Sequence, residues 1–157
     1  MIIRFANIMD IDEILILEEQ VFKLHSNKRS DLIDETKRFF DYDLLKSRIE
    51  SNSGKIFLVE DENSKIIGYC ITELNELKNH QVFKDMRNLE IEDFCIDEKY
   101  RRKGIGKVLF EEVIKYGKAK NVKFIELDVW EFNQNAKLFY EYLGMNIRAN
   151  KMELNLE

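Results

Sequence analysis

The sequence predicts a mixed α/β (α+β) fold, in which helices cover a central β-sheet. Short β-rich runs alternate along the chain with segments of helical period, which is typical of such folds. No Gly/Ser/Pro linker and no internal repeat interrupts this alternation. The 157 residues are the length of one domain with one core. We therefore expect a single domain over residues 1–157, with about six to seven strands and about four helices.

The first part of the chain is predicted to form one strand and two helices. Ile2–Phe5 is a short apolar run that indicates a strand. From Asp10 onward, apolar residues recur at a helical period, which predicts the first helix. The stretch Leu24–Asp31 is polar and aperiodic, so we expect a loop there, followed by a second helix over about Glu35–Ile49.

The middle of the chain is predicted to contain three strands. Lys55–Glu60 and Ile66–Thr72 are β-rich runs, and the polar residues Asp61–Lys65 between them are typical of a turn. These two runs therefore predict a hairpin. Leu89–Ile96 predicts the third strand of this part.

Helices and strands are expected to alternate through the rest of the chain. Gly106–Lys120 has an apolar face of helical period, and Phe124–Trp130 is an apolar run that indicates a buried strand. Asn135–Leu143 predicts a helix closed by Gly144, because glycine readily adopts the left-handed conformation that ends helices. The segment from Met145 onward predicts a final strand or hairpin.

The composition excludes several classes of protein. A net charge of −5 argues against binding to a nucleic-acid backbone, although a local basic patch can still hold one phosphorylated ligand. No apolar stretch approaches the roughly 18 residues of a membrane-spanning helix, and the start lacks the core of a signal peptide. We expect a cytoplasmic protein with no membrane partner. Cys70 and Cys95 lie in apolar runs without a metal-ligand spacing, so we expect reduced buried thiols and no metal.

The most informative segment is Arg101–Lys107, which joins a predicted strand to a predicted helix. The first turn of a helix has unpaired N–H groups and the positive end of the helix dipole, both of which favour phosphate. Gly104 and Gly106 let a diphosphate approach those amides. Four basic residues supply positive charge, namely Arg101, Arg102, Lys103 and Lys107.

Other phosphate-binding motifs fit this segment less well. The P-loop pattern needs a longer spacing before Gly-Lys and then Ser or Thr, whereas Val108 follows Lys107 here. A dinucleotide fingerprint needs a third glycine where Leu109 stands. A tight strand-to-helix turn with solvated basic side chains remains the structural alternative.

The segment resembles the GNAT superfamily of N-acetyltransferases, whose signature is Arg or Gln, two residues, Gly, one residue, then Gly or Ala. Arg101, Gly104 and Gly106 match that signature, and Asn133–Met145 is similar to the second cofactor segment of the family. The resemblance is strong over roughly residues 89–146. It implies a splayed sheet, a single N-acetyltransferase domain and acetyl-CoA as co-substrate, with no metal.

The resemblance also implies cofactor contacts residue by residue. Main-chain groups of Phe94, Cys95 and Ile96 are expected to pair with the pantetheine arm like an added strand. The amides of Arg102–Lys107, including that of Ile105, are expected to hold the diphosphate. Asn133 is expected to bond the pantetheine arm, Ala136 to leave room beside it, and Tyr140 to lie near the sulfur.

Acetyl transfer to an amine needs a base, and three carboxylates crowd into one predicted strand. Glu92 is the favoured base or water-holder, while Glu90 and Asp93 remain alternatives and substrate-binding candidates. Alternation along a strand places Glu90 and Glu92 with Phe94, and Asp93 on the other face, unless a bulge intervenes. A solvated strand face is the bland alternative.

The departing thiolate needs a proton. The resemblance implies that the Tyr140 hydroxyl supplies it. Plain aromatic packing beside Phe139 is the alternative role of this tyrosine.

The acceptor is expected to be a small cationic amine, because carboxylates attract ammonium groups. Short matches around residues 89–94 and 130–140 are similar to the diamine and polyamine acetyltransferase branch. His25, in the predicted loop, is a further substrate-binding candidate or a solvated side chain. A peptide N-acetyltransferase with a groove lined by Leu24–Asp31, and a non-catalytic acyl-CoA-binding module, remain open. So does the oligomeric state, with a homodimer among the candidates.

Overall fold

The computed structural model describes residues 1–156, and the chain divides into two compact units. The first unit is Met1–Leu127 and the second begins at Asp128. The expected single domain therefore stays a prediction, and each unit is described separately. The strands are β1 Ile2–Phe5, β2 Gly54–Glu60, β3 Ile66–Leu77, β4 Met86–Ile96 and β5 Phe124–Glu126. The helices are α1 Ile11–Lys28, α2 Tyr42–Glu50, α3 Ile105–Ala119 and, in the second unit, α4 Gln134–Tyr142, with short 3-10 turns η1 Ile8–Asp10 and η2 Glu98–Tyr100.

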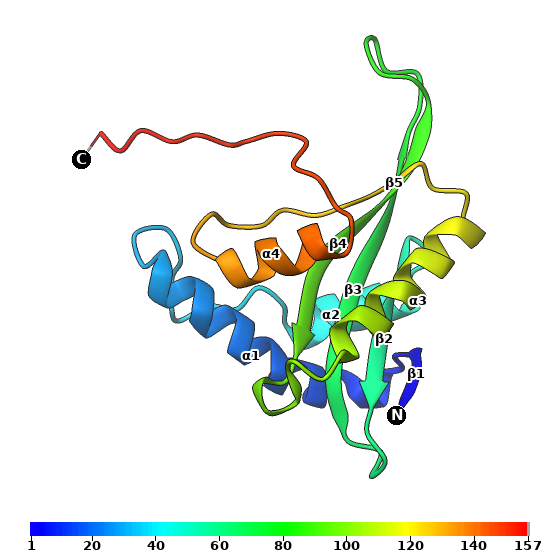
Figure 1. Cartoon of the computed structure of the whole chain (residues 1–157), viewed down its shortest axis with the longest axis vertical. Helices are drawn as coiled ribbons and strands as arrows, with labels where there is room; N and C mark the ends of the chain where they lie inside the picture. The colour runs from blue at the N-terminus through cyan, green and yellow to red at the C-terminus, as the bar shows by residue number, and fades with distance from the viewer. Residues whose placement is uncertain (157) are drawn as a thin grey trace. The chain divides into compact units, whose positions relative to one another are not determined.

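The first unit contains one mixed sheet with the strand order β1-β2-β3-β4-β5 (Figure 1). The first four strands are antiparallel, and β5 runs parallel to β4. The mixed α/β class and the four helices were expected, but the expectation of six to seven strands is wrong, because five strands form among residues 1–156. β5 pairs with β4 from Asn88 to Glu90, so β4 continues past the last pair as far as Ile96.

A β-bulge interrupts β4 where the acidic residues lie. Ile71 of β3 opposes Asp93, while the next residue, Thr72, opposes Ile91, so that Glu92 is an extra residue in β4. Directly opposed residues in an antiparallel pair point to the same side. Asp93 therefore shares a face with Ile71. Phe94, opposite Cys70, points to the other face.

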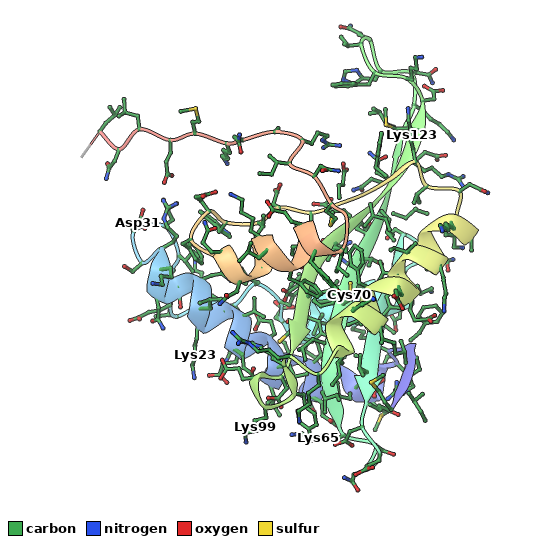
Figure 2. All side chains as sticks on the ribbon, in the orientation of Figure 1. Lys23, Asp31, Lys65, Cys70, Lys99 and Lys123 are labelled. Carbon is green, nitrogen blue, oxygen red and sulfur yellow. The ribbon has the colours of Figure 1, made fainter. Side chains whose placement is uncertain are left out.

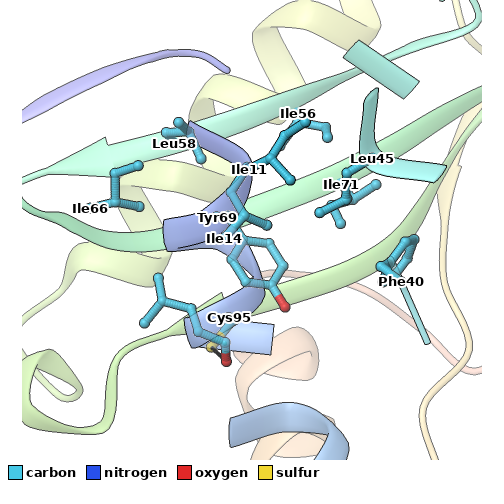
Figure 3. Close-up of a cluster of buried hydrophobic side chains, with 11 residues drawn as sticks. Ile11, Ile14, Phe40, Leu45, Ile56, Leu58, Ile66, Tyr69, Ile71 and Cys95 are labelled. Carbon is cyan, nitrogen blue, oxygen red and sulfur yellow. Dashed lines mark hydrogen bonds between the residues drawn. The ribbon is translucent and has the colours of Figure 1, made fainter. Parts of the chain in front are cut away.

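Helices cover both faces of this sheet. The larger core lies on the face covered by α1 and α2 (Figure 3). Its buried members are Ile11, Ile14, Leu17, Phe40, Leu45, Ile56, Leu58, Ile66, Tyr69, Ile71 and Cys95. On the other face, Phe57 makes an edge-to-face contact with Tyr116 of α3, with ring centroids 5.5 Å apart. Phe57 opposes Cys70, so Phe94 of β4 lies on the α3 face as well.

The structure corrects the expected loop and second helix. Residues 24–28 belong to α1, because His25 and Ser26 continue its partly buried side and no helix breaker intervenes. The expected helix over Glu35–Ile49 instead begins at Tyr42, where the Asp41 carboxylate accepts the Leu44 backbone N–H at 2.8 Å.

The end of the chain departs most from expectation. The strand expected over Phe124–Trp130 ends at Glu126, and Phe124 is 45% exposed, so the run is not a buried strand. Residues 145–156 contain no strand. The expected final strand or hairpin from Met145 onward is therefore wrong for these residues, and the side chains of Met152, Leu154 and Leu156 are all more than 80% exposed.

Candidate active site

The N-terminus of α3 forms the basic turn that the sequence predicted. Gly104 is the N-cap residue and has a φ of 79°, a left-handed conformation that favours glycine. A Cβ at Gly104 would meet no atom within 4 Å, so this backbone borders open space. The first bond of the helix runs from the Val108 N–H to the Gly104 carbonyl at 3.2 Å. The N–H groups of Ile105, Gly106 and Lys107 precede that bond and point out of the helix end.

The basic side chains around this turn suit a diphosphate. Arg101, Arg102, Lys103 and Lys107 are all exposed. Backbone amides of a helix N-terminus together with cationic side chains form a typical site for phosphate oxygens. The residues present therefore fit the diphosphate of acetyl-CoA.

The turn is fixed to the sheet by polar contacts. The Arg101 Nε donates to the Ile96 carbonyl at 2.8 Å, so this guanidinium braces the end of β4. The Tyr100 hydroxyl donates to Asp61 at 3.0 Å, and the ammonium groups of Lys65 and Lys103 lie over its ring. Figure 2 labels Lys65 and Lys99 at this end of the first unit. These contacts join the turn to the β2–β3 hairpin and define its shape.

Glu92 is the carboxylate whose surroundings best suit a base. Its Oε1 accepts from Arg48 Nη2 of α2 at 2.7 Å, while its Oε2 is buried without a hydrogen-bond partner among residues 1–156. Burial raises the pKa of Glu92, and the nearby charges of Glu73 and Glu90 raise it further, whereas Arg48 lowers it. One oxygen of this carboxylate is therefore available to a proton donor.

Asp93 is also buried, but both of its oxygens have partners. The Tyr69 hydroxyl donates to Oδ2 at 2.6 Å, and the Phe94 backbone N–H donates to Oδ1 at 2.8 Å. Burial raises the pKa of Asp93 to about 6, against the effect of these two donors. Asp93 is thus better placed to hold Tyr69 and the bulge than to accept a further proton.

Glu90 and His25 have less distinctive surroundings. Glu90 lies on the same face and accepts from the Asn75 side-chain amide at 2.9 Å. His25 lies in α1, not in a loop, with its Nδ1 2.8 Å from the Val21 carbonyl and its ring against Phe39. These contacts give His25 a structural role at the end of α1.

Cys95 and Cys70 are buried free thiols, as expected. The Cys95 Sγ lies 3.6 Å from the Leu17 carbonyl of α1, and burial raises the pKa of this thiol to about 12. Both thiols are therefore protonated and unreactive at neutral pH.

The second unit holds the remaining predicted residues. The Asn133 Oδ1 caps α4 by accepting the Ala136 N–H at 3.2 Å. The Tyr140 ring packs against Phe139. At the other end of α4, Gly144 has a φ of 92°, and its N–H and that of Met145 donate to Glu141 and Tyr140, which is a Schellman motif. The predicted closure by Gly144 is confirmed.

Sequence reasoning missed three residues around Glu92 and Asp93, namely Arg48, Tyr69 and Glu73. They come from α2 and β3, and nothing in the sequence links them to β4. It also missed Glu18, a fully buried carboxylate of α1 whose Oε2 lies 3.5 Å from Nη1 of Arg38. A signal for Glu18 exists, because it occupies the apolar face of α1, one turn after Ile14.

Other kinds of site receive no support from the described residues. Within residues 1–156, no group of three or more His, Cys, Asp and Glu side chains could hold a metal ion. Over the same range, no helix is long and apolar enough to cross a membrane. A shallow hollow of about 220 Å³ lies on the β3–β4 hairpin around Leu77 and Met86, and none of the predicted site residues lines it.

A strand that carries a buried carboxylate and leads into a basic helix N-terminus defines a site for group transfer from a diphosphate-bearing donor. The model of the acetyltransferase (GNAT) family matches residues 16–145, so the chain belongs to that family. The chain is an N-acetyltransferase, and the family uses acetyl-CoA as co-substrate.

Three relatives illustrate the match. A solved tetramutant of a Bacillus halodurans protein is 35% identical, with a TM-score of 0.95 and coverage of 99% of this chain and 100% of that chain. An uncharacterised N-acetyltransferase of Lactobacillus delbrueckii subsp. lactis is 27% identical over 139 residues, which are 87% of this chain and 79% of the relative. The L-ornithine N5-acetyltransferase of Arabidopsis thaliana is 38% identical over 69 residues, which are 44% of this chain and 30% of the plant protein.

Proposed function

We propose that this chain transfers the acetyl group of acetyl-CoA to a primary amine of a small cationic molecule, by direct attack of the amine on the thioester. One observation carries the proposal. Glu92 keeps one buried carboxylate oxygen without a hydrogen-bond partner among residues 1–156, on the part of β4 that extends past β5. Such an oxygen can accept a proton from an attacking amine, directly or through a water molecule.

The proposed reaction balances its protons with residues of this chain. Free alkyl amines are mostly protonated at pH 7, so Glu92 takes one proton to give the neutral nucleophile. The carbon–nitrogen bond forms and the carbon–sulfur bond breaks, while a backbone N–H of β4 stabilises the negative charge on the carbonyl oxygen. The Tyr140 hydroxyl donates a proton to the departing thiolate, and the second proton of the attacking nitrogen replaces it on the tyrosine oxygen. Glu92 then releases its proton to solvent. The family resemblance alone supports the role of Tyr140.

The cofactor is proposed to bind along β4 and the turn that follows. Main-chain groups of Phe94, Cys95 and Ile96 pair with the pantetheine arm, and the amides of Arg102–Lys107 hold the diphosphate. Asn133 and Ala136 contribute from the second cofactor segment. The family match runs through both compact units, which supports one acetyltransferase domain over residues 1–157.

The charges near Glu92 support a cationic acceptor. On the side of the sheet covered by α1 and α2, the strands β3 and β4, the two helices and the segment between them contribute five carboxylates and two guanidinium groups. They are Glu18, Glu73, Glu90, Glu92, Asp93, Arg38 and Arg48. This excess of negative charge attracts an ammonium group. The plant relative named for L-ornithine adds support for the diamine-like branch. The peptide alternative loses support, because much of its expected groove loop is helix.

Release of free thiol from acetyl-CoA, measured across polyamines, aminoglycosides, amino acids and short peptides, tests this proposal. We expect strong turnover on a cationic small molecule, with an acetylamide product confirmed by mass spectrometry. Glu92→Gln should abolish most of it, whereas Glu76→Gln, an exposed carboxylate on the β3–β4 hairpin, should not. Turnover on peptides alone, or full activity of Glu92→Gln, would contradict the proposal.

A further inference from the structure

Arg48 is the residue of α2 that reaches the acidic strand. Its Nη2 donates to Glu92 Oε1 at 2.7 Å, and its Nη1 donates to Glu73 Oε2 at 2.9 Å. The three side chains are largely buried, with 27% of Arg48, 19% of Glu73 and 20% of Glu92 exposed. A largely buried ion pair is less screened by salt than a surface pair, and loss of one partner leaves the other charge buried and uncompensated.

The two carboxylate oxygens of Glu92 have different surroundings. Oε1 is held by the guanidinium, while Oε2 is buried without a hydrogen-bond partner among residues 1–156. We propose that Arg48 is a positioning residue for Glu92, which fixes Oε1 so that Oε2 is the oxygen presented to the acceptor amine. This inference rests on the proposed function of Glu92 as the base.

The fork of arginine is necessary for this role. The terminal torsion of a glutamate side chain is broad, so an unbraced carboxylate samples many orientations. The planar guanidinium of Arg48 donates to two carboxylates at once. The bond to Glu73 holds the guanidinium in place, and the bond to Glu92 then holds the orientation of that carboxylate. A lysine would keep the charge but would replace the planar fork by a point charge on a flexible stem. Arg48→Lys therefore separates the effect of charge from the effect of orientation.

The charges facing Glu92 act in opposite directions. Arg48 on α2 lowers the pKa of Glu92, while Glu73 on β3 and Glu90 on β4 raise it, in addition to burial. Asp93, the next residue in β4, couples to Glu92 as well, because the Glu92 charge raises the pKa of Asp93. Removing Arg48 should therefore raise the pKa of Glu92, whereas removing the charge of Glu73 should lower it.

A carbon-13 NMR titration of the glutamate side-chain carboxyls tests these signs in the whole chain without any acceptor. The Glu92 signal is assigned by its absence in Glu92→Gln. We expect its midpoint to move to higher pH in Arg48→Gln and to lower pH in Glu73→Gln. Arg87→Gln, which breaks an exposed pair with Glu76, is the matched control and should leave the midpoint unchanged. Shifts of Arg48→Gln and Glu73→Gln in the same direction, or none, would overturn the inference.

Kinetics with cadaverine as acceptor test the orientation. Arg48→Gln should lower kcat by roughly ten- to a hundredfold, as expected for a displaced catalytic group. In Arg48→Lys, the pH below which kcat decreases should match that of the native protein, because the positive charge is kept. The maximal kcat should stay as low as in Arg48→Gln, because the planar guanidinium is lost. A kcat of Arg48→Lys equal to that of the native protein would refute the need for the fork. If Glu92→Gln keeps full activity, the proposed function fails. If Glu92→Gln loses activity but the Arg48 variants keep the kcat of the native protein, only the positioning role of Arg48 fails.

Discussion

Replacing Asp93 by Asn removes a buried negative charge while the side chain keeps its shape. Tyr69 and the Phe94 backbone N–H each donate to one oxygen of Asp93. In Asp93→Asn, the remaining oxygen can accept the Phe94 N–H, and the amide nitrogen can donate to the Tyr69 hydroxyl, which then acts as acceptor. The variant therefore changes the charge more than the contacts.

The size of the effect follows from the pKa. Burial raises the pKa of Asp93 from 3.8 to about 6. Below pH 3.8 the carboxyl is neutral in both the folded and the unfolded state. As the pH rises toward 6, the unfolded state loses its proton first, so stability falls with rising pH. At about 1.4 kcal/mol for each pH unit, the native protein loses at most about 3 kcal/mol by pH 7.

Urea denaturation of both proteins between pH 4 and pH 8 measures this loss. Asp93→Asn should gain stability relative to the native protein as the pH rises, with the gain complete by about pH 7. Tyr69→Phe provides a control, because it removes a donor to the carboxylate and should increase the loss at neutral pH. A stability difference between Asp93→Asn and the native protein that does not vary with pH would refute the reasoning.

Three further predictions concern the cofactor, the proton donor and a second buried acid. Gly104→Val should weaken acetyl-CoA binding measured by calorimetry, because the valine side chain blocks approach to the α3 amides. Asn79→Val places valine at another left-handed position, on the β3–β4 hairpin, with a strain on the order of 1–2 kcal/mol, and should not weaken binding. Equal binding by both variants would contradict the proposed diphosphate site at the N-terminus of α3. Tyr140→Phe should lower turnover with little change in cofactor affinity, and unchanged turnover would remove Tyr140 from the mechanism. Glu18→Gln should reduce the loss of thermal stability from pH 5 to pH 8, because burial raises the pKa of Glu18. Glu111→Gln, at an exposed position of α3, should leave that loss almost unchanged, and identical profiles for Glu18→Gln and the native protein would count against the buried charge.

Local patterns predicted most of the elements of the fold. The apolar runs indicated the places of β1 to β4, and the glycines and basic residues after Leu89–Ile96 indicated the strand-to-helix turn at Gly104. The sequence failed where tertiary contacts decide. Polar residues near His25 suggested a loop, but they continue α1, and the apolar run from Phe124 contributes only a short exposed strand.

Only two parts of the candidate site were predicted from the sequence, namely the carboxylates of β4 and the basic turn before α3. Glu92 could be chosen from the residue types alone. The bulge at Glu92 could not, because it depends on the register with β3, and it places Asp93 on the face of Glu90 and Phe94 on the opposite face. Arg48 and Glu73 could not be predicted, because the residues that they contact are distant in the sequence. Arg48 lies 44 positions from Glu92 and 25 positions from Glu73, and the packing of α2 on the sheet brings these residues together. Long-range pairs of this kind leave no periodic signal in a single sequence.

The preference for a cationic acceptor is the part of the account that a single measurement tests most directly. We would compare kcat/KM for three primary amines of similar length, namely cadaverine, aminopentanol and aminohexanoate, whose far ends are an ammonium, a hydroxyl and a carboxylate group. The account predicts that cadaverine is the best substrate and aminohexanoate the poorest, and that added salt narrows the difference. Equal values for the three amines, or a preference for aminohexanoate, would contradict it.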